Sequence, residues 1–95
     1  MTDTTVRITG ITLIDAEPSL NGDRVVAMFD CEAAGCIFFK MELLRAGSGD
    51  GVLVRAPRLD PKEPRKRAYK ITDDGLRSAI AQAGERAFKA LTGAA

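Results

Sequence analysis

Two runs of alternating apolar residues flank a short segment of small residues, and this pattern constrains the fold more than any other feature of the chain. The apolar phase consists of Val25, Ala27, Phe29 and Cys31 in the first run and of Ile37, Phe39, Met41 and Leu43 in the second. An alternation of period two is typical of a β-strand with one buried face. We therefore predict an antiparallel hairpin that pairs residue 31 with 37, 29 with 39, 27 with 41 and 25 with 43.

The segment between the two runs, residues 33–35, becomes a three-residue loop in this register, with Gly35 in a left-handed conformation. Cys31 then faces the core, and Cys36 lies opposite Glu32 on the other face of the sheet. Two thiols on opposite faces cannot form a disulfide. Four residues separate them and the chain has no histidine, so they match neither a redox pair nor a zinc site. We expect two free thiols.

The remaining patterns complete a small α+β domain. Residues 5–16 and 24–32 are rich in β-branched and apolar residues, and the alternation of the first run changes phase at Gly10, which predicts a bulge there. Residues 52–56 and 68–71 predict two further short strands. We expect a four- to five-stranded antiparallel sheet.

The end of the chain has a helical pattern, over about residues 73–92. The predicted buried stripe consists of Leu76, Ile80, Ala83, Ala87 and Leu91. We expect one long C-terminal helix packed on the sheet, in a single domain that spans residues 1–95 with its core over 6–92.

Several function classes are excluded or disfavoured by composition. A chain of 95 residues without histidine has no imidazole for catalysis. The carboxylates Asp30, Glu32 and Glu42 fall in the outward phase, where solvated charge is the default. No apolar run reaches the ~18–20 residues of a membrane span, and the first residues do not resemble a signal peptide. We expect a cytoplasmic protein that is not an enzyme, with no cofactor, no metal, no small-molecule substrate and no membrane partner.

The net charge of +1 hides a strong asymmetry along the chain. Residues 1–50 carry four basic and eight acidic side chains, whereas residues 51–95 carry ten basic and five acidic ones. The proline-rich loop 57–67 and its flanks contain most of this excess. The candidate nucleic-acid-binding residues are Arg55, Arg58, Lys62, Arg65, Lys66, Arg67, Lys70 and Arg77.

Clustered lysines and arginines of this kind suit nucleic-acid phosphates. They also suit the surface of an acidic protein, and charge alone does not separate a nucleic-acid-binding regulator from a protein-interaction module. In the outward phase of the hairpin the apolar residues are Val26, Met28, Phe38 and Leu44. A bare apolar face calls for a cover, either a second subunit or the folded-back N-terminal strand. We expect a homodimer, formed through a strand edge or through this face.

The order of these segments resembles the stage V sporulation protein G (SpoVG) family, over residues 6–91. The stretch 51–58 reads GVLVRAPR and is similar to the family's G-L-F-V-x-M-P-S-K/R, and residues 65–71 resemble its R-D-I-A-H-P-I segment. Residues 72–80 resemble its helix opening, with Arg77 at the family's arginine. The resemblance implies a bacterial α+β protein that dimerises through its sheet and acts as a regulator. It also implies site-preferring DNA binding, with RNA the less favoured ligand.

Overall fold

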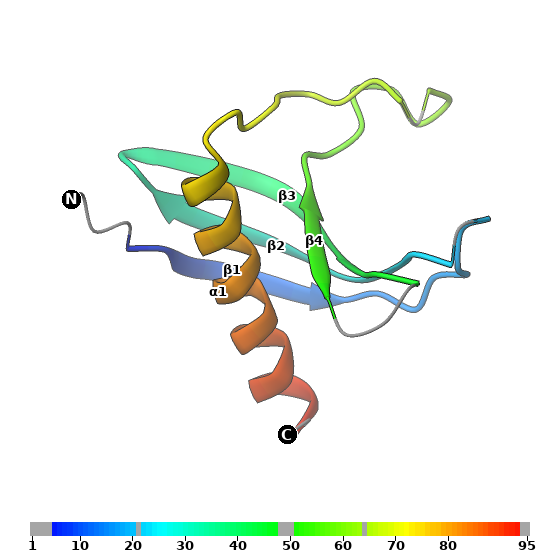
Figure 1. The fold of residues 1–95 in the computed structure, drawn as a ribbon, viewed down its shortest axis with the longest axis horizontal. Helices are drawn as coiled ribbons and strands as arrows, with labels where there is room; N and C mark the ends of the chain where they lie inside the picture. Colours follow the sequence, from blue (N-terminus) through cyan, green and yellow to red (C-terminus); the bar gives the residue numbers. More distant parts are fainter. Residues whose placement is uncertain (1–4, 21, 48–50, 64, 94–95) are drawn as a thin grey trace.

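The computed structural model describes residues 5–20, 22–47, 51–63 and 65–93, and within them it confirms the α+β class. The elements are β1 (Arg7–Leu13), β2 (Arg24–Ala33), β3 (Cys36–Arg45), β4 (Val52–Arg55) and α1 (Asp74–Thr92). The strands form one antiparallel sheet in the order β1-β2-β3-β4 (Figure 1). Residues 68–71 form no fifth strand.

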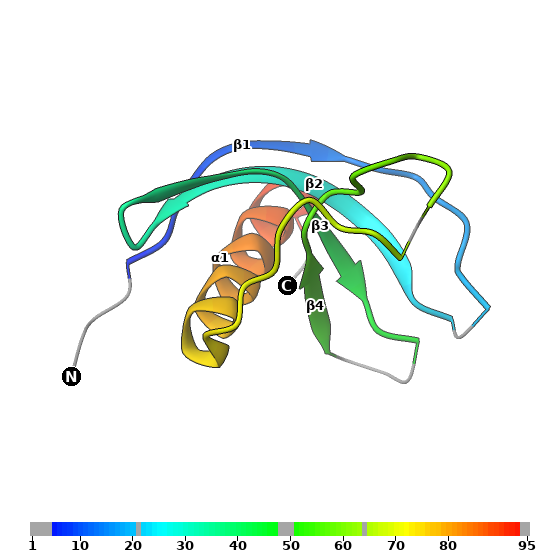
Figure 2. The same cartoon turned by 90° about the horizontal axis from the view of Figure 1, so that it is seen from above.

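The sheet is curved, and α1 lies against one of its faces, while no helix of the described residues covers the other (Figure 2). The largest fully buried side chains are Phe29, Met41, Leu43, Ile80 and Cys31. They come from the two central strands and the helix, so the core lies between α1 and the middle of the sheet. The loop between β4 and α1 crosses one end of the sheet before the helix begins (Figure 2).

Both ends of α1 are capped by residues that suit these positions. The Asp73 side chain accepts a hydrogen bond from the Leu76 backbone N–H at 3.1 Å, and Gly93 adopts a left-handed conformation at the C-terminus. The predicted stripe is correct as far as Ile80 and Ala83, which are buried. It is wrong at Leu91, which is 55% exposed because the last turns of α1 project past the edge of the sheet (Figure 1).

The hairpin between β2 and β3 forms, but its predicted register is wrong. Ala33 pairs with Cys36, which leaves a two-residue turn at Ala34 and Gly35 instead of a three-residue loop. Both turn residues have positive φ, 52° and 73°, as the tightest hairpin turns require. The left-handed conformation predicted for Gly35 is therefore confirmed. Ala34 also adopts this conformation, which the sequence did not predict.

Two bulges shift the register further along the same hairpin. Cys31 pairs with Phe38 and Phe29 with Met41, so two residues of β3 lie opposite the single residue Asp30. A second shift lies between Val25 and Ala27. The two-residue turn already moves the partner of Cys31 from residue 37 to Phe38, and each bulge shifts the register again beyond it. None of the four predicted pairs is therefore found.

The inverted phase changes which hairpin side chains are buried. Ile37 and Phe39 were predicted to face the core and instead are 57% and 60% exposed. Phe38 was predicted to face outward and instead packs on the core and on Tyr69, with ring centroids 5.8 Å apart. Leu44 is buried as well, and Val26 packs against the core, so three of the four residues of the predicted outward apolar face do not face outward.

The predictions for the bulge in β1 and for the two cysteines hold. The pairing of β1 with β2 shifts between Ile8 and Gly10, which confirms the predicted bulge. Cys31 is buried and Cys36 is exposed, and both are free thiols. None of the helices within the described ranges is long and apolar enough to cross a membrane.

Candidate nucleic-acid interface

The basic loop after β4 folds back on itself instead of extending. The backbone N–H of Leu59 donates to the carbonyl of Lys66, and that of Ala68 donates to the carbonyl of Pro57, both at 2.9 Å. Arg58 and Arg67 form an isolated antiparallel bridge between these two hydrogen bonds. The loop therefore resembles a short antiparallel hairpin, and its two ends meet beside the end of β4.

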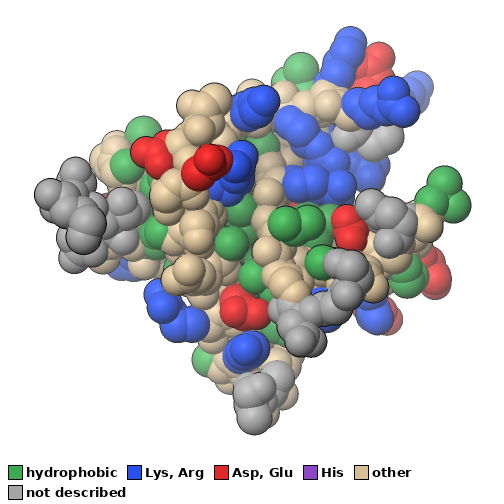
Figure 3. Space-filling view, in the orientation of Figure 1, with side chains coloured by type: hydrophobic (Ala, Val, Ile, Leu, Met, Phe, Trp, Pro, Cys, Tyr) green, Lys and Arg blue, Asp and Glu red, His purple; other side chains and the backbone are tan. Residues whose placement is uncertain are grey.

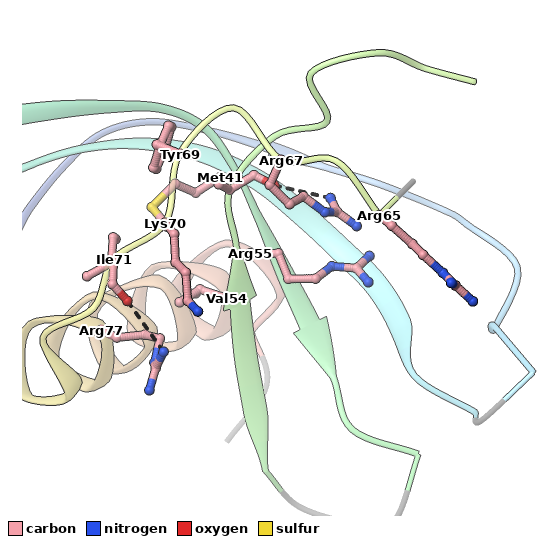
Figure 4. A pocket seen from close by; sticks show the side chains of 10 residues that line it. Met41, Val54, Arg55, Arg65, Arg67, Tyr69, Lys70, Ile71 and Arg77 are labelled. Carbon is pink, nitrogen blue, oxygen red and sulfur yellow. Dashed lines mark hydrogen bonds between the residues drawn. The ribbon is translucent and has the colours of Figure 1, made fainter. Parts of the chain in front are cut away.

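A groove of about 530 Å³ lies where this loop, the end of β4 and the first turn of α1 meet (Figure 4). Its cationic side chains are Arg55, Arg65, Arg67, Lys70 and Arg77. Its apolar lining includes Met41, Val54 and Ile71. The groove thus joins five of the eight residues proposed from the sequence, although they come from three separate parts of the chain.

Arg55 and Arg67 share one carboxylate, that of Glu42 on β3. Glu42 Oε1 lies 2.9 Å from Arg67 Nη1, 3.1 Å from Arg55 Nη2 and 3.2 Å from Arg55 Nε. Arg67 Nη1 also donates to the Ala56 carbonyl at 3.1 Å. The side chain of Glu42 is only 13% exposed, so the prediction of a fully solvated carboxylate is wrong at this position.

Arg77 is held at the helix end of the groove. Its guanidinium forms an ion pair with Asp74 and donates a hydrogen bond to the Ile71 carbonyl at 3.4 Å. The Asp73 side chain accepts a hydrogen bond from the Leu76 N–H, so one of the backbone N–H groups that the first turn of α1 leaves without a helical partner has an acceptor. Arg77 is therefore oriented by its own helix and by the loop that precedes it.

Arg65 and Lys70 are the least constrained cations of the groove. Their side chains have no hydrogen bond or ion pair within the described part of the chain. Figure 4 shows Lys70 reaching over Val54 toward Arg77, whereas Arg65 extends from the loop at the opposite end. Five cations against the carboxylates of Glu42 and Asp74 leave an excess of three positive charges around the groove.

Three predicted residues lie outside the groove lining. Lys66 forms an ion pair with Glu63 at 2.9 Å, and the backbone N–H of Lys62 donates to Asp60 in the turn of the loop. Arg58 contributes its backbone to the bridge with Arg67. These three residues belong to the loop that projects beyond β4. Lys and Arg side chains gather over this loop (Figure 3).

Tyr69 forms part of the wall and is fixed by its contacts. Its hydroxyl donates to the Phe39 carbonyl at 3.2 Å, and its ring packs on Phe38. Burial, with smaller contributions from Cys31 and Asp30, raises the pKa of Tyr69 to about 12. The phenol therefore stays neutral at ordinary pH, and its ring is engaged with Phe38.

The sequence reasoning missed Glu42 as part of the site. The available signal was its place directly opposite Arg55 in the pairing of β3 with β4, since opposite charges favour cross-strand positions. Within the described residues, no cluster of three or more acidic or cysteine side chains is placed to hold a metal ion. The arrangement suits an anion that contacts several guanidinium and ammonium groups together.

No family model, curated protein or solved structure matches the chain. The likeness to the SpoVG family therefore rests on the motifs in residues 51–58, 65–71 and 72–80 alone.

Proposed function

We propose that this protein is a small nucleic-acid-binding regulator that contacts phosphates through the groove at the end of β4. The observation that carries the proposal is the convergence of Arg55, Arg65, Arg67, Lys70 and Arg77 on one concave surface. Lysine and arginine side chains bind phosphate backbones because each contact releases condensed counterions. The regulatory role, and the preference for DNA over RNA, come from the resemblance to the SpoVG family.

We further propose that the protein acts as a homodimer. β1 and β4 are the edge strands of the sheet, and an edge strand offers backbone N–H and C=O groups for pairing with a second copy. Leu44 is buried and Phe38 is partly buried against the core, so the edges are the favoured route. Sedimentation at micromolar concentration tests this proposal, and a purely monomeric protein would contradict it.

A second candidate is a module that binds an acidic protein partner. The observation in its favour is the apolar lining of the groove by Val54 and Ile71, which are partly exposed and suit an apolar anchor flanked by carboxylates. This candidate shares the cationic rim, and only a binding measurement separates it from the first.

The deciding experiment is a titration of labelled duplex DNA and RNA at several salt concentrations. If each protomer of a dimer makes two or three phosphate contacts, log K falls against log[salt] with a slope of about −4 to −5. The absence of binding to both nucleic acids at low salt would reject the proposal in favour of the acidic-partner module.

A further inference from the structure

A single carboxylate oxygen organises two arginines of the groove. Glu42 Oε1 accepts from Arg67 Nη1 and from both Nε and Nη2 of Arg55, at 2.9 to 3.2 Å. The side chains of Glu42 and Arg67 are 13% and 19% exposed, so the contact between these two is largely shielded from water, whereas the side chain of Arg55 is 41% exposed. Shielding strengthens a charged contact and reduces its screening by salt.

The contact consumes only part of each guanidinium. Arg55 turns Nε and Nη2 toward Glu42, while Arg67 uses Nη1 for Glu42 and for the Ala56 carbonyl. A guanidinium has further N–H groups in a rigid plane. Among the described residues these remaining groups have no hydrogen-bond partner on either arginine, and both side chains line the groove.

We propose that Glu42 is a positioning residue for the nucleic-acid site, an inference that rests on the proposed function. Its carboxylate holds Arg55 and Arg67 in place before the ligand arrives, so that their remaining N–H groups meet a phosphate. Free arginine side chains lose considerable rotamer entropy when a ligand immobilises them. Glu42 removes much of this loss in advance, and Arg67 also fixes the base of the loop through its bridge with Arg58.

Neutralisation of Glu42 should change the affinity for nucleic acid in the direction opposite to the one that charge alone predicts. A carboxylate beside an anion site repels the anion, so its neutralisation alone would tighten binding. If Glu42 positions the arginines, its neutralisation weakens binding even though the groove gains positive charge. The sign of the change in affinity therefore distinguishes a positioning residue from a mere countercharge.

The test is Glu42→Gln, with Glu63→Gln as the matched control. Within the described part of the chain, the Glu63 side chain pairs only with Lys66 in the exposed loop. Glu63 lies outside the groove lining, yet its substitution changes the net charge equally. With a fluorescein-labelled 20-base-pair duplex as probe, we expect Glu42→Gln to bind about five- to tenfold more weakly, from the renewed cost of ordering two arginines. We expect Glu63→Gln to bind as the parent does or slightly more tightly.

The salt dependence of duplex binding is a second measurement, and a loss of fold stability alone would leave it unchanged. The slope of log K against log[salt] becomes shallower by about 0.9 for each phosphate contact that Glu42→Gln removes. An increase in affinity, or an unchanged affinity and slope, would overturn the positioning role while leaving the proposed function intact. A parent protein that binds neither duplex DNA nor RNA would overturn both.

Arg67→Lys keeps the proposal testable if Glu42→Gln fails to fold. This substitution preserves the charge of the groove but removes the planar guanidinium that joins Glu42 to the Ala56 carbonyl. We expect severalfold weaker binding at unchanged net charge. Binding equal to that of the parent would contradict the positioning role.

Discussion

The Asp30 side chain accepts a hydrogen bond from the backbone N–H of Lys40 at 2.8 Å, across the bulge between β2 and β3. Lys40 has a φ of 54°, a left-handed conformation that non-glycine residues adopt at a cost. The hydrogen bond stabilises this conformation, and the extra residue of the bulge lets Phe38 and Met41, three positions apart, both pack on the core side of the sheet. One carboxylate thus supports the bulge that returns Met41 to the core-facing side of β3.

We expect Lys40→Gly to stabilise the fold by about 0.5–1 kcal/mol, because glycine adopts a positive φ without steric cost. Asp30→Ala should destabilise it by about 1 kcal/mol, because the Lys40 N–H loses its acceptor. Urea unfolding of both variants measures these changes in the free energy of unfolding. A loss of stability in Lys40→Gly would show that the left-handed conformation carries no strain.

The same bulge shows where sequence reasoning reaches its limit. Alternation identified both strands, and the four-residue recurrence identified α1, because these periods follow from backbone geometry alone. The bulge at Gly10 was predictable because a glycine marked it. The bulge at Lys40 carries no such mark, and it depends on an acceptor, Asp30, that lies ten residues away.

The candidate site, like the sheet, has a part that the sequence predicts and a part that depends on the folded chain. The cationic segment was evident from composition, but its eight residues separate into a groove-lining set and a projecting set only when the loop folds. That fold depends on backbone hydrogen bonds such as Leu59 to Lys66, which have no signature in residue type. The role of Glu42 depends on the register of β3 with β4 together with the return of Arg67, a residue 25 positions away.

Gly84 should be intolerant of any side chain despite its helical position. A Cβ added there would lie 3.1 Å from two ring atoms of Phe29, which is fully buried in the core. Helix propensity alone predicts that Gly84→Ala stabilises the fold by about 1 kcal/mol. Overpacking outweighs this gain, and we expect a net destabilisation of about 1–2 kcal/mol.

Thermal and urea unfolding test this expectation, with Ala90→Gly on the exposed side of α1 as the measure of propensity. Ala90→Gly should destabilise by about 1 kcal/mol, since no packing changes there. A gain in stability for Gly84→Ala would mean that Phe29 moves aside without cost.

Stability should fall in alkaline solution because of Cys31. Burial, with a smaller contribution from the charge of Asp30, raises the pKa of the Cys31 thiol from 9.0 to about 11. Between these two values the unfolded chain has released a proton that the folded chain still holds. The free energy of unfolding is therefore unaffected by this group below about pH 9 and decreases above it, by at most about 1.4 kcal/mol per pH unit.

Urea unfolding from pH 8 to pH 10.5 measures this decrease, and Cys31→Ala should reduce its slope. Cys36→Ala is the control for the loss of a thiol, since Cys36 is exposed. A thiol reagent at pH 8 should modify Cys36 in the folded protein and Cys31 only after unfolding. Equal slopes for the parent and Cys31→Ala would contradict the assignment.

The cations of the groove should differ in what their removal changes. Cations without an ion pair should affect ligand binding alone, whereas a cation paired with Glu42 should also affect the stability of the fold. Arg65 and Lys70 have no partner in the described part of the chain, so Arg65→Ala with Lys70→Ala should change the free energy of unfolding by less than about 0.5 kcal/mol. Duplex binding should weaken by about tenfold or more, with a shallower salt slope, because two phosphate contacts are lost in each protomer.

Arg67→Ala should instead destabilise the fold by about 1–3 kcal/mol, because it leaves the shielded carboxylate of Glu42 with Arg55 alone. Arg86→Ala is the control for net charge, since Arg86 is exposed on α1 and absent from the groove lining. Anisotropy titrations and urea unfolding of the same samples give both quantities. If Arg86→Ala weakened binding as much as Lys70→Ala alone does, the affinity would depend on net charge and the groove would have no specific role.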